Sequence, residues 1–175
     1  KKGVRLKMKI KAPEGMSSAE RVIFYDCEEN RKFYQYGTSG GWEKYKKNPV
    51  LGGGKIGTCF DVSLLLEKDT RERPLFKMWF SWRTRRAIGY TESCDGIHWK
   101  DPIEVLSITA GSEWEADEVN RPSVIYHNGR YMMWYSGQMK PYLEDGRSVI
   151  GLAESDDGIH WGKRILPVME PDQEW

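Results

Sequence analysis

The sequence contains Glu92-Ser93-Cys94-Asp95-Gly96-Ile97-His98-Trp99 and repeats it, with one substitution, as Glu154-Ser155-Asp156-Asp157-Gly158-Ile159-His160-Trp161. A shorter form, Ser39-Gly40-Gly41-Trp42, precedes both. Each form is followed by a short apolar segment, at residues 48–51, 105–106 and 168–169. Recurrence at intervals of about 60 residues is typical of repeated supersecondary units. The repeats therefore predict the architecture.

The second and third repeats also match upstream of this motif. Met78-Trp79-Phe80-Ser81 corresponds to Met133-Trp134-Tyr135-Ser136, and Ile88-Gly89 corresponds to Ile150-Gly151. Such segments are rich in aromatic and branched residues and are bounded by turn dipeptides, of which Asn128-Gly129 is the clearest hairpin signal. Four short antiparallel strands per repeat predict the blades of a β-propeller.

The predicted fold class is therefore all-β, with one partial propeller domain over residues 1–175. We expect a divergent or incomplete blade at 1–48, blades at 49–102 and 103–166, and the start of a next blade at 167–175. About three blades would be present, whereas propellers close with roughly four to eight. The remaining blades would come from a segment outside this chain or from another chain.

The composition fits a globular β protein, because 39% hydrophobic and 13% aromatic residues can form a core. A net charge of +1 gives no strong attraction to nucleic acid or to an anionic membrane, and no apolar run is long enough to span a bilayer. The three cysteines lack the spacing of a metal site, so we expect free thiols, which favours a cytoplasmic location. No motif requires a cofactor or a metal ion.

The third repeat resembles a known family of proteins. The run from Arg121-Pro122 through Asn128-Gly129 to Gly137, together with the motif at 155–161, resembles the five-bladed β-propeller glycosidases. That superfamily includes the family 43 arabinanases and xylosidases, the family 32 and 68 invertases and levansucrases, and the family 130 mannoside phosphorylases. The resemblance implies five blades when complete and a carbohydrate substrate. It does not imply one activity, because the repeated motif belongs to the scaffold.

Residues used identically in each repeat are interpreted as structural. In the motif, Asp-Gly forms a turn and the tryptophan fills the gap between blades. His98 and His160 occupy equivalent places, so they are not predicted to be catalytic. Function is expected where the repeats differ, at the starts of the inner strands. The segments that differ there are residues 52–60 and 113–120.

Glycoside hydrolysis needs two carboxyl groups, about 5–5.5 Å apart for retention or about 6.5–9.5 Å apart for inversion. The resemblance implies that Asp61 is one of them. Glu118 is the predicted general acid, with Asp117 as its substitute. The alternative is that residues 113–118 form only a solvated acidic loop and that Asp61 caps a backbone amide. Family 43 enzymes place the acid two residues before the matching proline, where this chain has Asn120.

Substrate-binding residues, Asn120 among them, are predicted beside this pair. Arg121 suits a substrate carboxylate or phosphate, which looks more like the phosphorylase branch. Arg83 is either an anion ligand or part of a solvated hairpin tip, and Trp114 and Trp82 are candidates for stacking on sugar rings. The predicted function is a glycoside hydrolase-like activity on a carbohydrate. The alternatives are a non-catalytic glycan-binding or interaction propeller and a glycoside phosphorylase.

Overall fold

A computed structural model describes residues 45–140 and 147–171 of the chain. The chain divides into two compact units, Lys1–Asn48 and Pro49–Trp175, and the described strands belong to the second unit. The predicted incomplete blade at 1–48, including Trp42, therefore falls almost entirely outside the described residues.

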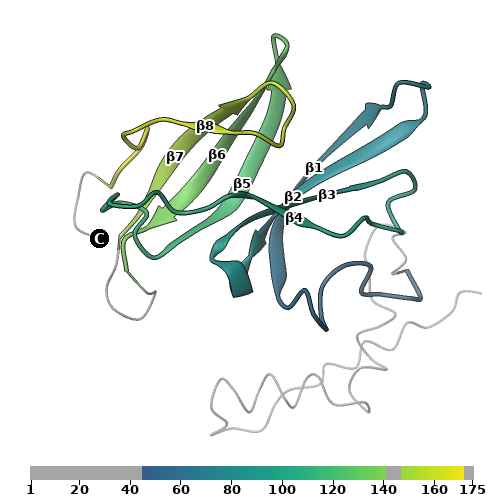
Figure 1. The fold of residues 1–175 in the computed structure, drawn as a ribbon, viewed down its shortest axis with the longest axis horizontal. Helices are drawn as coiled ribbons and strands as arrows, with labels where there is room; N and C mark the ends of the chain where they lie inside the picture. The colour runs from purple at the N-terminus through teal and green to yellow at the C-terminus, as the bar shows by residue number, and fades with distance from the viewer. Residues whose placement is uncertain (1–44, 141–146, 172–175) are drawn as a thin grey trace, which may run out of the picture. The chain divides into compact units, whose positions relative to one another are not determined.

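The described strands form two four-stranded antiparallel sheets (Figure 1). The first sheet has the order β1-β2-β3-β4 and consists of β1 (Cys59–Lys68), β2 (Pro74–Trp82), β3 (Ala87–Ser93) and β4 (Ile103–Leu106). The second has the order β5-β6-β7-β8 and consists of β5 (Glu118–His127), β6 (Arg130–Gln138), β7 (Ser148–Ser155) and β8 (Gly162–Lys163). A short 3₁₀ helix, η1 (Arg83–Arg85), connects β2 to β3. The predicted four antiparallel strands per repeat are confirmed.

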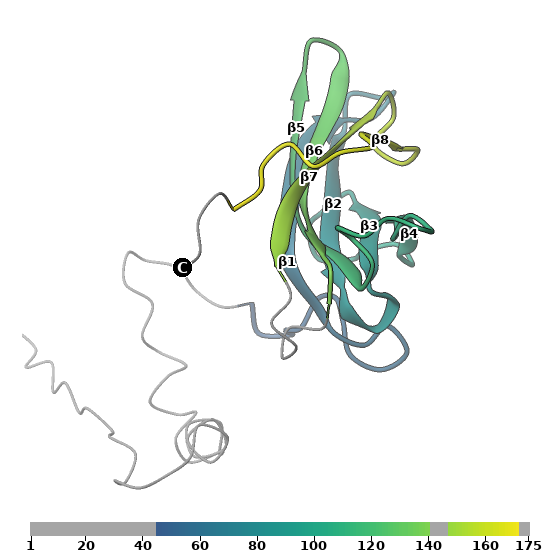
Figure 2. The same cartoon turned by 90° about the vertical axis from the view of Figure 1, so that its left-hand side faces the viewer.

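The hairpin between β5 and β6 projects at one end of the second sheet (Figures 1 and 2). His127 pairs with Arg130 across a two-residue turn in which Asn128 has φ 50° and Gly129 has φ 82°. Two successive positive φ angles define the turn that best matches the twist of antiparallel strands. The hairpin predicted from Asn128-Gly129 is therefore confirmed.

In each sheet, the apolar segment that follows the repeated motif also pairs with the third strand. Leu106 at the end of β4 pairs with Ile88, and Met169 forms an isolated bridge with the equivalent Ile150. These pairs lie beyond residues 102 and 166, where we placed the blade boundaries. The start of a next blade was predicted at 167–175, but residue 169 pairs with the second sheet.

The largest apolar core of the described residues lies where the two sheets face each other. Trp79 of β2 is fully buried there, and its indole Nε1 donates to the Gly158 carbonyl across the interface at 2.8 Å. Its ring lies 6.2 Å from that of Trp161 and 5.9 Å from that of Tyr131. The motif tryptophan of the second sheet thus fills the gap between the sheets, as predicted. Trp134, which the repeat alignment matches to Trp79, is only half-buried.

The repeated motif forms a hydrogen-bonded turn in both sheets. In the second copy the backbone amides of Ile159 and His160 donate to Asp157 Oδ1, each at 2.8 Å, and His160 Nδ1 lies 2.6 Å from Oδ2. The bond with His160 is the main cause that holds the pKa of Asp157 below its ordinary value. Asp95 and His98 repeat this arrangement in the first copy. The structural interpretation of the motif is confirmed.

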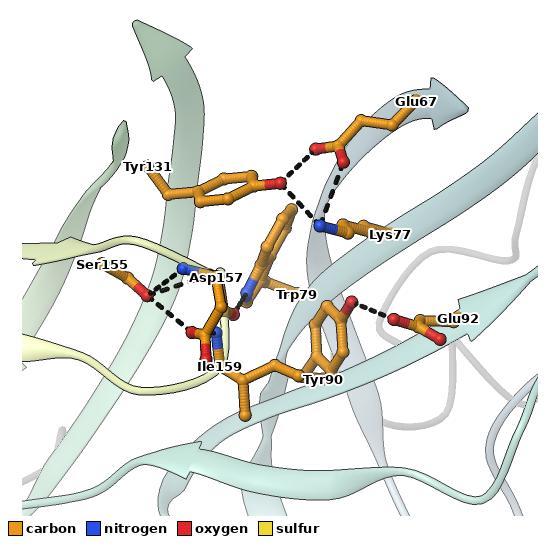
Figure 3. A network of polar contacts seen from close by, with 10 residues as sticks. Glu67, Lys77, Trp79, Tyr90, Glu92, Tyr131, Ser155, Asp157 and Ile159 are labelled. Carbon is orange, nitrogen blue, oxygen red and sulfur yellow. Dashed lines mark hydrogen bonds and ion pairs between the residues drawn. The ribbon is translucent and has the colours of Figure 1, made fainter. Parts of the chain in front are cut away.

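A polar network ties the first sheet to the second (Figure 3). Tyr131 of β6 donates its hydroxyl to Glu67 Oε1 of β1 at 2.6 Å and accepts from Lys77 Nζ of β2 at 2.5 Å. Lys77 Nζ also lies 3.0 Å from Glu67 Oε2. Because the three groups satisfy one another, the network holds the two sheets in a fixed register.

Two features are absent from residues 45–140 and 147–171. No helix in this part of the chain is long or apolar enough to cross a membrane. No group of three His, Cys, Asp or Glu side chains there is arranged to hold a metal ion.

Candidate functional site

The inner strands β1 and β5 carry the same irregularity near their starts. Asp61 and Val62 together face one residue of β2, and Arg121 and Pro122 likewise face one residue of β6. Asp61 has φ 46° and Arg121 has φ 52°, in the left-handed region that glycine normally occupies. A non-glycine residue there costs about 1–3 kcal/mol, and such strain is concentrated at functional sites. The repeat alignment of the sequence places Asp61 and Arg121 at equivalent positions, and their matching bulges confirm this equivalence.

The two bulges are joined across the sheet interface. The Arg121 backbone amide donates to Ser81 Oγ of β2 at 2.7 Å, and its guanidinium Nε lies 3.5 Å from Asp61 Oδ2. Both side chains are about half exposed. The bulge of β5 is therefore held by the first sheet, and the strained residues of two neighbouring inner strands meet as an ion pair.

A pocket of about 580 Å³ opens beside this pair. Its lining residues come from the β2–β3 connection, the start of β5 and the end of β6, and are Arg83, Arg86, Asp117, Glu118, Asn120, Arg121 and Gln138. Five of the predicted site residues, Arg83, Asp117, Glu118, Asn120 and Arg121, thus share one pocket. Asp61 does not line the pocket, but its carboxylate contacts the lining residue Arg121.

Glu118 is the most unusual group in this pocket. It is the first residue of β5 and only 8% exposed, and its Oε1 atom is buried without a hydrogen-bond partner among the residues that the structure describes. A buried polar atom without a partner costs about 1–3 kcal/mol, so few are retained without a reason. The wall of the pocket therefore contains a buried carboxyl group with one oxygen that makes no hydrogen bond to the described residues.

The neighbouring Asp117 differs because its carboxylate is occupied. Arg86 Nη1 lies 2.7 Å from Asp117 Oδ1, and the Asp117 backbone amide donates to the Gln138 carbonyl at 2.9 Å. The Arg86 carbonyl in turn accepts from the Val119 amide at 3.3 Å. Arg86 thereby attaches the start of β5 to the first sheet through both its side chain and its backbone.

The three arginines of the pocket differ in their partners. Arg86 is paired with Asp117 and Arg121 with Asp61. The Arg83 guanidinium lies 4.6 Å from the centre of the Phe60 ring, and no carboxylate of the described residues lies within 4.0 Å of it. Arg83 is therefore the pocket cation that is best placed to receive a negatively charged group.

Trp82 and Trp114, which we predicted to stack on sugars, are held by protein contacts. Trp82 is 7% exposed and donates to the Ile56 carbonyl at 2.7 Å. Trp114 covers Gly137 and Gly151 so closely that a Cβ atom on either glycine would lie 2.6–2.7 Å from the indole ring. Neither tryptophan lines the pocket. Sugar stacking by these two rings stays a prediction.

The loop before β5 is anchored in the second sheet. Glu115 is 1% exposed; its Oε1 lies 2.8 Å from Lys163 Nζ of β8, and its Oε2 accepts from the Tyr135 hydroxyl at 3.1 Å. Burial lowers the pKa of Lys163 although the bond to Glu115 opposes that change. The alternative of a solvated acidic loop is wrong for Glu115 and Glu118, because both are buried.

No model of a known protein family matches the chain. The uncharacterized protein MT1551 of Mycobacterium tuberculosis is 35% identical over 74 residues, which cover 42% of this chain and 22% of that protein. The match therefore spans about a fifth of that relative.

Among solved structures, a thermostable family-43 glycoside hydrolase matches with a TM-score of 0.52 and 22% identity, over 71% of this chain and 37% of the other. A β-1,2-mannobiose phosphorylase from Listeria innocua matches with a TM-score of 0.53 and 22% identity, over 69% of this chain and 35% of the other. The chain has the fold of the propeller-type glycoside hydrolases. The resemblance seen in the sequence is thus confirmed for the fold, and the chain spans about a third of each of these structures.

Two residues that line the pocket, Gln138 and Arg86, were not predicted as site residues from the sequence. Gln138 follows Ser136 by two residues, as Arg83 follows Ser81, so the repeat alignment places Gln138 and Arg83 at equivalent positions. That alignment was a signal for Gln138. In the sequence Arg86 is only one of several neighbouring arginines. Its pairing with Asp117 depends on the packing of the two sheets.

Proposed function

We propose that this pocket catalyses cleavage of a glycosidic bond, with Glu118 as the general acid. The observation that supports this is the buried Glu118 carboxyl group, whose Oε1 atom has no hydrogen-bond partner among residues 45–140 and 147–171. A general acid presents a proton to the leaving oxygen, and a carboxyl group at the pocket wall with one oxygen left unbonded is placed to do so. Asp117 is less suited, because Arg86 holds its carboxylate at 2.7 Å.

Asp61 is the proposed second carboxylate, acting as base or nucleophile. It lies on the neighbouring inner strand, next to the pocket, and contacts the lining residue Arg121 at 3.5 Å. The amides of Asn120 and Gln138 supply donors and acceptors for sugar hydroxyls. Retention or inversion would then follow from the carboxyl separation in the substrate complex.

We further propose that the two sheets are blades of a five-bladed propeller. On β1 the side chains of Val62, Leu64 and Leu66 are 60%, 50% and 63% exposed, whereas Leu65 packs against the shared core. Such a row of exposed apolar side chains on an inner strand is what a neighbouring blade would cover. That blade would come from another segment of the protein or from another chain.

The experiment measures hydrolysis of a panel of 4-nitrophenyl and methyl glycosides by the protein and by two variants. Glu118→Gln keeps the shape of the side chain but cannot donate the catalytic proton. We expect the rate on a methyl glycoside to fall by about 10²–10⁴-fold, the usual contribution of a positioned acid. A 4-nitrophenyl glycoside should lose less, because its leaving group needs little protonation.

Asp117→Asn serves as the matched control, because it removes the adjacent carboxylate and should cost much less than Glu118→Gln. Equal losses in the two variants would count against Glu118 as the acid. Binding of sugars without turnover of any glycoside would instead identify a glycan-binding propeller and would refute the catalytic proposal.

Phosphorolysis is the second candidate, because three arginines line the same pocket. Arginine holds phosphate with two parallel hydrogen bonds, and Arg83 has no carboxylate partner within 4.0 Å among the described residues. A phosphorylase would require inorganic phosphate for turnover and would release a sugar phosphate. Arg121→Ala should then abolish the phosphate requirement or the activity, whereas hydrolysis in phosphate-free buffer would exclude this candidate.

A further inference from the structure

The loop of residues 107–117 connects the last strand of the first sheet to the first strand of the second. Both ends of this loop converge on one ammonium group. Lys163 Nζ of β8 donates to the Ser107 carbonyl and to Thr109 Oγ1 near the start of the loop, and to Glu115 Oε1 near its end. Glu115 Oε1 also accepts from the Thr109 amide at 2.9 Å, which closes the loop on itself.

The adjacent Trp114 fixes the same segment from the other side. Its Nε1 atom donates to the Ile165 carbonyl at 3.1 Å, and its ring packs against Tyr135 with centroids 5.9 Å apart. The ring also lies against Gly137 and Gly151, where no larger residue would fit without movement. The consecutive loop residues Trp114 and Glu115 are therefore both held against the second sheet.

This anchor lies only three residues before Glu118. A residue in extended chain spans at most about 3.3–3.6 Å, so Glu115 and Glu118 are separated by roughly 11 Å of backbone or less. Because Glu118 Oε1 has no hydrogen-bond partner in the described part of the chain, the side chain is not held through that atom. Its placement depends on its packing and on the backbone that carries it.

The repeat alignment shows that the anchor is specific to the second sheet. Lys55 stands at the position of Glu115, and Asp101 stands at the position of Lys163. Both residues are exposed. A feature present in only one repeat is not required by the scaffold. The buried pair occurs in the repeat whose inner strand carries the unpartnered carboxyl group.

We propose that Glu115 and Lys163 are positioning residues that hold the Asp117-Glu118 segment at the pocket. The inference rests on the proposed role of Glu118 as the acid. Neither residue touches the substrate, because neither lines the pocket. Their action is to keep the backbone of the loop in one conformation, so that Glu118 presents its proton at a fixed place.

The test uses Lys163→Met and the double variant Glu115→Gln/Lys163→Met in the full chain. The double variant leaves no unpaired buried charge, so it folds even where the single variant fails to. Lys77→Met is the matched control. Lys77 also forms a partly buried pair with a glutamate and bonds a tyrosine, but at Glu67 and Tyr131, outside the pocket.

The first readout is amide hydrogen exchange, which needs no substrate. We expect at least tenfold faster exchange of the Thr109 and Asp117 amides in the double variant and unchanged exchange of both in Lys77→Met. Unchanged exchange in the double variant would overturn the proposal, whatever the activity of the protein. If the protein cleaves no glycoside at all, the proposed function fails while this readout still decides whether the pair holds the loop.

The second readout separates positioning from a general loss of structure. Misplacement of the acid should lower kcat at least tenfold on a methyl glycoside and less than threefold on a 2,4-dinitrophenyl glycoside, the same leaving-group pattern that we expect for Glu118→Gln. In a Glu118→Gln background the double variant should cause no further loss. An equal loss on both substrates, or full additivity with Glu118→Gln, would refute the positioning role.

Discussion

Glu115 and Glu118 are buried glutamates three residues apart, and we predict that replacing their carboxyl groups by amides has opposite consequences. Glu115 is 1% exposed and bonded to Lys163, Tyr135 and the Thr109 amide. Glu118 is 8% exposed, and its Oε1 atom has no partner. Substitution by glutamine keeps the size of both side chains, so the comparison isolates the electrostatic and hydrogen-bonding terms.

The expected magnitudes follow from these contacts. Glu115→Gln leaves Lys163 as a mostly buried charge without its carboxylate, and breaking such a pair costs about 3–5 kcal/mol. Glu118→Gln breaks no bond to Oε1 and removes a carboxyl group that is costly to bury, so the free energy of unfolding should stay the same or rise by up to about 1 kcal/mol. At about 2–4 °C per kcal/mol for a chain of this size, Glu115→Gln should lower the Tm by roughly 6–20 °C.

The assay is urea denaturation followed by circular dichroism, with thermal melting as a second measurement. Activity on a methyl glycoside should show the reverse order: the loss should be larger for Glu118→Gln than for Glu115→Gln. Glu118→Gln is expected to be stable but inactive. The reasoning is refuted if Glu118→Gln lowers the free energy of unfolding as much as Glu115→Gln, because Glu118 would then have stabilising contacts that the structure does not show.

Two further predictions concern stability. Trp79→Ala should cost about 3–5 kcal/mol because the ring is fully buried between the sheets, whereas Trp134→Ala at the equivalent position should cost only about 1–2 kcal/mol; similar losses in urea denaturation would contradict the assignment of the shared core. The pKa of Asp157 lies below its ordinary value of 3.8, so its ionised form stabilises the fold above about pH 4 and that contribution is lost as the pH falls further. Asp157→Asn should therefore reduce the drop in Tm between about pH 4 and pH 2, and an identical drop in both proteins would show that the turn does not contribute.

The strand pairing of both sheets could be predicted from the sequence because its signals are local. Turn dipeptides such as Asn128-Gly129 have conformational preferences of their own, and the repeated motif satisfies its hydrogen bonds within a few residues. The repeat also placed Asp61 and Arg121 at equivalent positions, and both have the same positive φ. The division of the chain into five-bladed propeller units stays a prediction.

The differences among the acidic residues before β5 were decided by tertiary structure. Sequence alone shows Glu115, Asp117 and Glu118 as one acidic run. Lys163 lies 48 residues after Glu115, and Arg86 lies 31 residues before Asp117, so only sheet packing brings these partners together. Glu118 is left with an unpartnered oxygen because no cation of either sheet reaches it among the described residues.

The sequence by itself thus determined the two four-stranded sheets, the hairpin turns and the strand starts at which the repeats differ, because those features follow from short-range backbone preferences and from repetition. Only the tertiary structure decided which carboxyl group is paired, which is buried without a partner and which tryptophans are occupied by packing. Burial and charge pairing depend on groups that are far apart in the chain, and their contacts exist only after the sheets have packed together.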